Sequence, residues 1–463
     1  MTGYRYSIGA NEDTEMYGLA QKLQLPMATL ARAALIAAAL FATAIPTVAQ
    51  YYPPAGSNEW DSVTPESVGW NETAVPELIS YLRQTQTNAF VALKDGRIVI
   101  EWYADSFAPD STWIWYSAGK SLTAVLVGLA QQEGLLSISD TTSSYLGRWT
   151  LLSEQQENEI TIRHQLTMTT GLNENNFFCT LRICLNYTAD AGTRWVYHNA
   201  PYSLLRDVVE TASGEDINAF TDSRLGPTIG LSGEWIESGY NNFYYSTARS
   251  AARFGLLAMS NFSWDGVPVL SDSAYVAALT APSQDLNPSY GYLWWLNGQA
   301  SFISPESPES FPGPLSPNAP PDVFVAAGSQ GQFVSVARSE GLVWVRMGES
   351  PSLSYVPTEY HDEIWQHLNP VIGYVPTSTE EPIDERKMPL DVYPNPANNF
   401  TTIFGRAGER IAIYDLIGRI VRHQVVAVTG PVRIDVSGLH PGRYFIVRQS
   451  SNGRAGALLT IVR

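Results

Sequence analysis

The pattern of apolar residues predicts two elements in the middle of the chain. Residues 122–130 form an almost unbroken aliphatic run that predicts a buried helix, and residues 113–116 lead into it as a short apolar approach. Residues 323–336 predict a strand interrupted by Gly328 and Gly331. A glycine inside a strand often marks a close approach of the backbone to another group, and we expect that group to be a substrate carbonyl.

The pattern changes after residue 370. Residues 371–389 are rich in Pro, Thr and Glu, which is typical of a linker. Short apolar segments follow, separated by turn signals such as Ile417-Gly418 and Pro441-Gly442, and they predict a small all-β sandwich. Its expected strands cover residues 401–404, 411–414, 419–426, 432–436, 444–449 and 457–462.

An alanine-rich apolar stretch lies near the N-terminus at residues 33–45. It is too short for a stable membrane span and fits a secretory leader that is cleaved after Ala49. Residues 1–26 are mostly polar and include several acidic residues, which do not suit the start of such a leader. We therefore expect translation to begin at Met27. The alternative to a cleaved leader is that the apolar stretch is a tethering helix.

Ser117 and Lys120 stand three residues apart, just before the predicted helix. Positions i and i+3 of a helix share a face, so Lys120 can hydrogen-bond the Ser117 hydroxyl. A serine at a helix N-terminus also lies where free N–H groups favour a developing oxyanion. The alternative is a surface lysine beside a capping serine.

Two further segments carry groups that suit a nucleophilic serine. Tyr197 and Asn199 form a Tyr-x-Asn motif. A tyrosine is a useful base near neutral pH only when a cation stabilises its phenolate, and Lys120 could supply that cation. The N–H of Ser329, in the glycine-containing strand, could pair with the N–H of Ser117 as an oxyanion hole.

These three elements, in this order, resemble the serine β-lactamase and penicillin-recognising superfamily. The resemblance covers about residues 60–368 and is closest to the 6-aminohexanoate-dimer hydrolase and class C-like esterase branch. It implies an α/β (α+β) fold of the β-lactamase/transpeptidase type, in which helices flank an antiparallel sheet that is joined to an α-rich region.

The resemblance also implies hydrolysis through an acyl-enzyme, with no metal and no organic cofactor. Ser117 would attack an amide or ester carbonyl, Lys120 and Tyr197 would share the role of base, and water would resolve the acyl-enzyme. Asn199 would orient the lysine or the substrate amide. The backbone N–H groups of Ser117 and Ser329 would stabilise the oxyanion.

The third motif departs from the β-lactamase pattern. Ala326-Ala327-Gly328 stands where β-lactamases carry Lys-Thr-Gly, and residues 323–336 contain no basic side chain. Gly328 and Gln330 are still expected to bind substrate, but the lysine that would pair with a β-lactam carboxylate is absent. We therefore expect a small-molecule or oligomeric substrate with an uncharged amide or ester. The alternatives are a β-lactamase, a D-amino-acid peptidase and a non-catalytic, penicillin-binding-like surface protein.

The predicted C-terminal sandwich carries a second resemblance. Residues 393–397, 414–419 and 435–444 resemble the C-terminal sorting domain of type IX secretion cargo, over about residues 390–463. This implies export through the periplasm, with the secretion machinery as a partner, to the cell surface or the medium. An immunoglobulin-like adhesion or carbohydrate-binding module is the alternative.

Composition excludes some partners and bounds the domains. A net charge of −17 with only 28 Lys and Arg opposes binding to nucleic acid or to an anionic membrane surface. The length suggests one large domain and a smaller one. We expect a leader at residues 1–50, a hydrolase domain at 51–370, a linker at 371–389 and a sorting domain at 390–463.

The only two cysteines are Cys179 and Cys184, and in an exported protein we expect them to form a disulfide. The bond would close a tight loop at the rim of the cleft and stabilise the fold by about 2 kcal/mol. A metal site is not expected, because no further Cys and no His pair lies at ligand spacing nearby. We expect His164 to be structural and His198 to point away from the serine.

Overall fold

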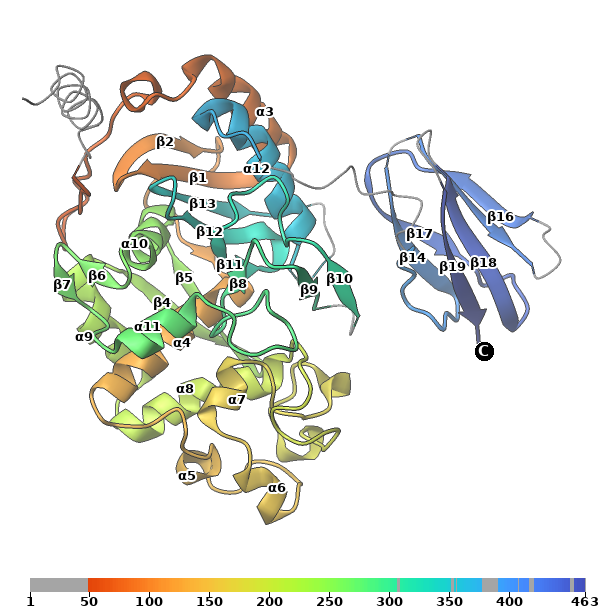
Figure 1. Cartoon of the computed structure of the whole chain (residues 1–463), viewed down its shortest axis with the longest axis horizontal. Coiled ribbons are helices and arrows are strands. Elements are labelled where there is room, and N and C mark those ends of the chain that lie inside the picture. Colours follow the sequence, from red (N-terminus) through yellow and green to blue (C-terminus); the bar gives the residue numbers. More distant parts are fainter. Residues whose placement is uncertain are drawn as a thin grey trace, which may run out of the picture. The chain divides into compact units, whose positions relative to one another are not determined.

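The computed structural model describes residues 49–305, 309–350, 354, 356–376, 390–406, 408–415, 420–449 and 454–462 (Figure 1). The expected leader up to residue 48, the expected linker from residue 377 and the turn signal at residues 417–418 lie outside these ranges. The described residues form a larger region of helices and strands up to residue 376 and a smaller all-β region from residue 390.

A six-stranded antiparallel sheet forms the centre of the larger region, with the strand order β2-β1-β13-β12-β11-β8. The first strand of this sheet in sequence, β1, therefore pairs with the last, β13. The strands are β1 (Thr87–Lys94), β2 (Arg97–Tyr103), β8 (Trp295–Leu296), β11 (Phe324–Gly328), β12 (Gln332–Ala337) and β13 (Leu342–Gly348).

Helices flank this sheet and build a separate helical layer beside it (Figure 1). The α-helices are α3 (Val75–Gln84), α4 (Gly119–Gln132), α5 (Ser143–Leu146), α6 (Glu154–Asn158), α7 (Ile162–Leu166), α8 (Asn199–Ser213), α9 (Ile217–Ile229), α10 (Ala248–Met259), α11 (Ser273–Leu279) and α12 (Thr358–Ile372). The 3₁₀ helices are η1 (Pro65–Val68), η2 (Glu72–Ala74), η3 (Tyr116–Ala118), η4 (Glu174–Asn176), η5 (Arg182–Cys184) and η6 (Ser329–Gly331).

Short strands complete the larger region. One small sheet has the order β3-β5-β4, and two hairpins are formed by β6 with β7 and by β9 with β10. These strands are β3 (Trp113–Ile114), β4 (Gly233–Ser238), β5 (Asn241–Ser246), β6 (Ser263–Trp264), β7 (Val267–Pro268), β9 (Ser301–Ile303) and β10 (Ser310–Pro312).

Both faces of the central sheet are covered because its strands are apolar on both sides. Successive residues of a strand point to opposite faces. On β12, Val334 packs beside Gly255 of α10, whereas its neighbour Phe333 packs its ring on His361 of α12. Both strands β12 and β13 are buried along their whole length, as a sheet between two helical layers requires.

The predicted buried helix is present as α4. Every residue from Gly119 to Ala130 is buried, because aliphatic side chains on all sides of the helix find neighbours. The helix packs against α8 and against β11 of the central sheet. Its N-terminus is therefore fixed where the helical layer meets the sheet.

The predicted strand at residues 323–336 is instead a hairpin. Strands β11 and β12 pair antiparallel, with Gly328 opposite Gln332, and η6 forms the turn between them. The left-handed φ of +62° at Gln330 and +74° at Gly331 closes the turn. Sequence reasoning identified the glycines but not the reversal, because the turn contains none of the usual Asn-Gly or Asp-Gly hairpin pairs.

The smaller region from residue 390 is the expected β-sandwich. A two-stranded sheet of β14 and β17 and a four-stranded sheet of order β16-β15-β18-β19 share a core of aliphatic residues. The six expected strands are all present, as β14 (Phe400–Gly405), β15 (Arg410–Tyr414), β16 (Ile420–Val425), β17 (Gly430–Asp435), β18 (Gly442–Gln449) and β19 (Arg454–Ile461). The predicted fold class is confirmed for both regions.

Candidate active site

Ser117 lies in η3, which runs directly into α4, and its side chain is partly exposed. The chain enters this turn through Trp115, whose backbone N–H donates to Tyr244 O at 2.8 Å and whose indole donates to Ser246 Oγ at 2.8 Å. Tyr116 follows with φ +46°, a conformation that costs energy in L-residues and recurs at functional sites. The anchored, strained approach presents Ser117 at the end of a buried helix.

Lys120 is the centre of the site, and only 2% of its surface is exposed. Its Nζ donates to Ser117 Oγ at 2.9 Å and to Asn199 Oδ1 at 2.5 Å. Burial lowers the pKa of Lys120 well below the ordinary lysine value. The predicted spacing thus places against the serine hydroxyl a lysine whose charged form is disfavoured by burial.

Tyr197 and Asn199 approach Lys120 from the start of α8. Lys120 Nζ lies 4.8 Å from the centroid of the Tyr197 ring, above its face. Tyr197 is buried, and its ring stacks on that of Trp295 at 5.7 Å between centroids. Ser117, Lys120, Tyr197 and Asn199 therefore come together as the spacing of the motifs suggested.

Gly328 lies against the backbone of the serine turn. A Cβ placed at Gly328 would stand 2.3 Å from Trp115 O and 3.1 Å from the N atom of Ser117. The close approach predicted from the sequence is present, but the group approached is this backbone, where a substrate carbonyl was expected. Only glycine allows the end of β11 to come this near.

The two residues after Gly328 have different surroundings. Ser329 is partly exposed, and its carbonyl accepts a hydrogen bond from Gln332 Nε2 at 3.2 Å. Gln330, expected to bind substrate, uses its side-chain Oε1 to accept from the backbone N–H of Ser350 at 3.1 Å. Its side chain therefore stabilises the turn, and a role toward substrate stays a prediction.

Ala326 and Ala327 are buried in β11, where a β-lactamase carries a Lys-Thr pair. Along β11, η6 and β12 the side chains present no cation. A substrate carboxylate at this edge would find no charged partner on the hairpin.

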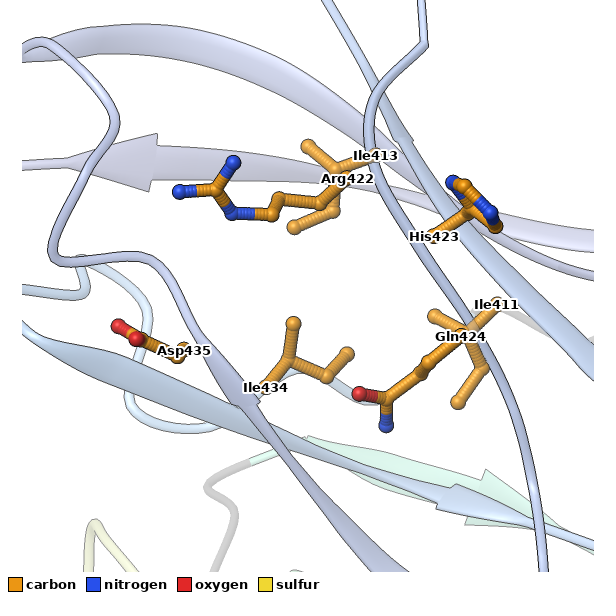
Figure 2. A pocket seen from close by; sticks show the side chains of 7 residues that line it. All are labelled: Ile411, Ile413, Arg422, His423, Gln424, Ile434 and Asp435. Atoms are coloured by element: carbon orange, nitrogen blue, oxygen red, sulfur yellow. The ribbon is translucent and has the colours of Figure 1, made fainter.

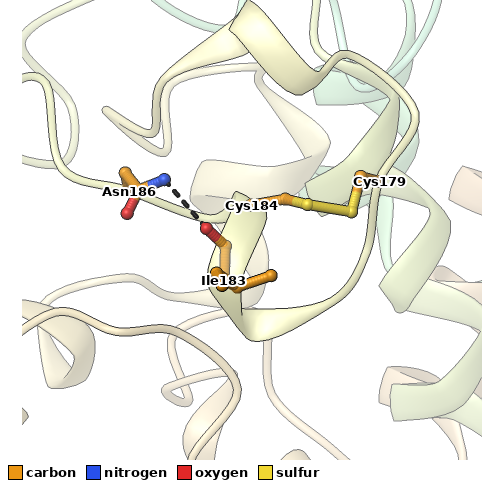
Figure 3. The surroundings of a disulfide bond; sticks show 4 residues. All are labelled: Cys179, Ile183, Cys184 and Asn186. Carbon is orange, nitrogen blue, oxygen red and sulfur yellow. Dashed lines mark hydrogen bonds between the residues drawn. A yellow bond between two sulfur atoms is a disulfide. The ribbon is translucent and has the colours of Figure 1, made fainter.

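Cys179 and Cys184 form the predicted disulfide, with 5.9 Å between their Cα atoms (Figure 3). Just after the loop, Asn186 Nδ2 donates at 3.1 Å to Ile183 O, which lies within it. Phe177, just before the loop, lies 6.3 Å from the Tyr197 ring between centroids. The loop is therefore continuous with the aromatic surroundings of the site.

His164 has the structural setting that was expected, and the direction expected for His198 stays a prediction. His164 Nδ1 accepts from the backbone N–H of Thr161 in the capping box of α7. His198 is buried, its ring stacks on Phe177, and burial lowers its pKa to about 4. Neither ring belongs to the group of side chains around Lys120 Nζ.

Sequence reasoning missed two residues beside the site. The Tyr202 ring lies 4.2 Å from Lys120 Nζ, and its position three residues after Asn199 on α8 was the available signal. Arg346 lies in β13 and donates to the carbonyls of Gln330 and Gly331. Its signal was a single charged residue inside an otherwise apolar strand.

The β-sandwich has a pocket of its own, of about 130 Å³, between strands β15, β16 and β17 (Figure 2). Its lining residues are Ile411, Ile413, Arg422, His423, Gln424, Ile434 and Asp435. This set has no serine, lysine or cysteine nucleophile. Among the described residues, no cluster of His, Cys, Asp and Glu is suited to hold a metal ion.

The site and the fold agree with the sequence pattern of the Beta-lactamase family, which matches residues 77–354. The chain belongs to the Beta-lactamase family. The matched part contains the Ser-x-x-Lys and Tyr-x-Asn motifs and both strands of the glycine hairpin. The chain is therefore a β-lactamase-fold member of a family of hydrolases.

Two relatives are similar to this chain at low identity or over a short stretch. A 6-aminohexanoate-dimer hydrolase of Paenarthrobacter ureafaciens is 32% identical over 74 residues, which is 16% of this chain and only 19% of that relative's length. An uncharacterized protein of Alkalihalophilus pseudofirmus is 24% identical over 277 residues, covering 52% of this chain and 77% of its own length.

Solved structures share the fold. A candidate 6-aminohexanoate-dimer hydrolase from Bacillus anthracis superposes with a TM-score of 0.53 at 16% identity, covering 70% of this chain and 91% of its own. EstA from Arthrobacter nitroguajacolicus superposes with a TM-score of 0.51 at 12% identity, covering 68% and 99%. At such identities the likeness concerns the fold alone.

The second sequence resemblance is confirmed as well. Residues 391–459 match the family described as the secretion system C-terminal sorting domain. Within the described parts of the chain, none of the helices has the length and apolar character that a bilayer crossing requires.

Proposed function

We propose that this Beta-lactamase family member is an exported serine hydrolase that cleaves amide or ester bonds through an acyl-enzyme on Ser117. The observation that carries the proposal is the position of Lys120. Its buried amine bonds both Ser117 Oγ and Asn199 Oδ1, and burial disfavours its charged form. A surface lysine beside a capping serine would be solvated and would keep its charge.

In the proposed first step, neutral Lys120 accepts the Ser117 proton while Oγ bonds to the substrate carbonyl carbon. The carbonyl oxygen takes the electron pair, and the N–H groups of Ser117 and Ser329 stabilise its charge. The Lys120 ammonium then returns a proton to the leaving amine or alcohol as its bond to carbon breaks. In the second step, water adds to the acyl carbon, Lys120 takes a proton from it, and Ser117 leaves reprotonated.

Tyr197 and Asn199 hold Lys120 for both transfers in this proposal. Asn199 Oδ1 accepts from the amine and so fixes its direction. The electron-rich face of the Tyr197 ring lies under the amine and favours the ammonium formed after proton transfer. A direct role of the Tyr197 phenolate as base is the alternative assignment within the same mechanism.

The proposed substrate is an uncharged amide or ester, because the hairpin beside Ser117 offers no cation to a carboxylate. A panel of nitrophenyl esters, short amide oligomers, D-amino-acid amides and nitrocefin tests this, with the Ser117→Ala variant as the control. We expect turnover of esters or uncharged amides and poor turnover of nitrocefin. Nitrocefin hydrolysis as efficient as ester hydrolysis would show that another group binds the carboxylate.

We further propose a division of the chain into a hydrolase domain at residues 51–370, a linker at 371–389 and a sorting domain at 390–463. The sorting-family match at residues 391–459 supports export by the secretion machinery that reads such domains. The enzyme would then act at the cell surface or in the medium. If the sandwich instead bound carbohydrate, a chain that lacks it would lose activity only on insoluble polymer.

A further inference from the structure

Arg346 is a fully buried cation in the middle of β13, with 0% of its surface exposed. Its Nε donates to Thr87 Oγ1 at 2.9 Å, and one Nη donates to Thr85 O at 2.9 Å and also to Glu349 O. Among the described residues, no carboxylate forms an ion pair with it. Burying such a charge is costly, so its hydrogen bonds must serve a specific part of the structure.

The other Nη of Arg346 holds the turn η6. It donates to Gln330 O at 2.6 Å and to Gly331 O at 3.1 Å. Gln330 has a left-handed φ of +62°, which a non-glycine residue keeps only when its surroundings enforce it. Arg346 therefore fixes the strained turn that follows Gly328.

This turn lies directly beside the nucleophile. The end of β11 touches the backbone of residues 115–118, and Ser329 begins the turn at that contact. A carbonyl held on one side of the turn fixes the plane of its peptide, because the peptide bond is rigid. Arg346 thus fixes the two peptides Gln330–Gly331 and Gly331–Gln332, and through them it limits how far Ser329, at the start of the turn, can rotate.

We propose that Arg346 is a positioning residue for the oxyanion hole: it holds the η6 turn so that the Ser329 N–H stays beside the Ser117 N–H. The proposal rests on the proposed function of Ser117. Arginine suits this task because its planar fork of five N–H groups reaches several carbonyls at once, which the ammonium of a lysine cannot do.

Arg253 provides a matched control. It lies in α10 with only 5% of its surface exposed, and its two Nη atoms donate to the carbonyls of Pro53, Pro54, Ser57 and Ile229. Within the described residues it too has no carboxylate ion pair. None of its partners belongs to η3, α4 or the hairpin, so it shares the burial of Arg346 but not the site.

The test compares Arg346→Lys and Arg253→Lys in the full chain, with kcat and KM on a nitrophenyl ester, the rate of fluorophosphonate labelling and the melting temperature. We expect both variants to melt earlier. Only Arg346→Lys should lose kcat and labelling rate, by at least about tenfold with KM nearly unchanged, because the lost bonds act on the transition state. The proposal would be overturned if, for each degree by which the melting temperature falls, kcat fell by the same factor in both variants.

Thr87→Val decides the question if Arg346→Lys does not fold. It removes one bond to the guanidinium and leaves the charge in place. A fall in kcat with KM unchanged supports the positioning role, whereas wild-type kcat overturns it. Activity retained by Ser117→Ala would instead overturn the proposed function itself, so the two failures are distinguishable.

Discussion

Lys120 combines burial with two close hydrogen-bond acceptors, and burial lowers its pKa. Loss of water around the amine disfavours the ammonium more than a serine and an amide oxygen can offset. A lower pKa raises the fraction of neutral amine in contact with Ser117. In the proposed mechanism that neutral amine is the base, so the chemistry of the serine would depend on the burial of its neighbour.

The first prediction concerns the pH dependence of kcat/KM. Because burial lowers the pKa of Lys120, its neutral form persists to lower pH than in water, and activity is lost only as pH falls through that lowered pKa. We expect the acidic limb of the profile on a nitrophenyl ester to lie well below the ordinary lysine value of about 10.4. A rate that rises only above about pH 10 would contradict the assignment.

The second prediction is that Ser117 and Lys120 act as one unit. Ser117→Ala and Lys120→Ala should each lower kcat by orders of magnitude, and the double variant should be little worse than the singles. Tyr197→Phe keeps the ring face under the amine and should lower kcat far less; a loss as large as that of Lys120→Ala would make the Tyr197 phenolate the base. Circular dichroism and melting curves serve as the folding control. If the losses in kcat of the single variants multiplied in the double variant, the residues would not act as a shared proton-transfer unit.

At the scale of elements, features encoded by local sequence were predicted better than contacts between distant segments. The i, i+3 spacing of Ser117 and Lys120 and the apolar run of α4 are local, and both were correctly placed from the sequence. The reversal at η6 is local, but its turn lacks the usual hairpin pairs. The contact of Gly328 with Trp115 O joins segments about 200 residues apart in sequence, so no local pattern encodes it. Arg346 was overlooked for the same reason, since its partners come from other elements.

The third prediction concerns the loop closed by Cys179 and Cys184. Labelling of denatured, unreduced protein should find no free thiol, and reduction should expose two. Because the loop is short, we expect the Cys179→Ser, Cys184→Ser double variant to lose about 2 kcal/mol of unfolding free energy. If two thiols were labelled without reduction, the mature protein would contain no disulfide.

At the scale of the whole molecule, the described residues contain separate cores. One large cluster of buried apolar residues lies between Trp70 and Val371, and a distinct one lies between Leu390 and Ile461. Regions with their own cores can fold independently. The expected domain division rests on the change of composition after residue 370 and on the hydrophobic pattern of short strands that follows, and its boundaries stay a prediction.

The fourth prediction is that the C-terminal region serves transport only. A chain ending at residue 376, after α12, should fold and keep full activity on soluble esters, because every member of the proposed site precedes that point. In a host with type IX export it should remain in the periplasm, while the full chain leaves. Normal secretion of the shortened chain would refute the sorting role.

The most direct test of the central claim is covalent labelling of Ser117. The full-length protein is treated with a fluorophosphonate, digested and sequenced by mass spectrometry, with Lys120→Ala as the comparison. We predict one modified residue, Ser117, and a labelling rate that falls by orders of magnitude in Lys120→Ala. No labelling of Ser117 in folded protein, or equal labelling without Lys120, would contradict the claim that this lysine activates this serine.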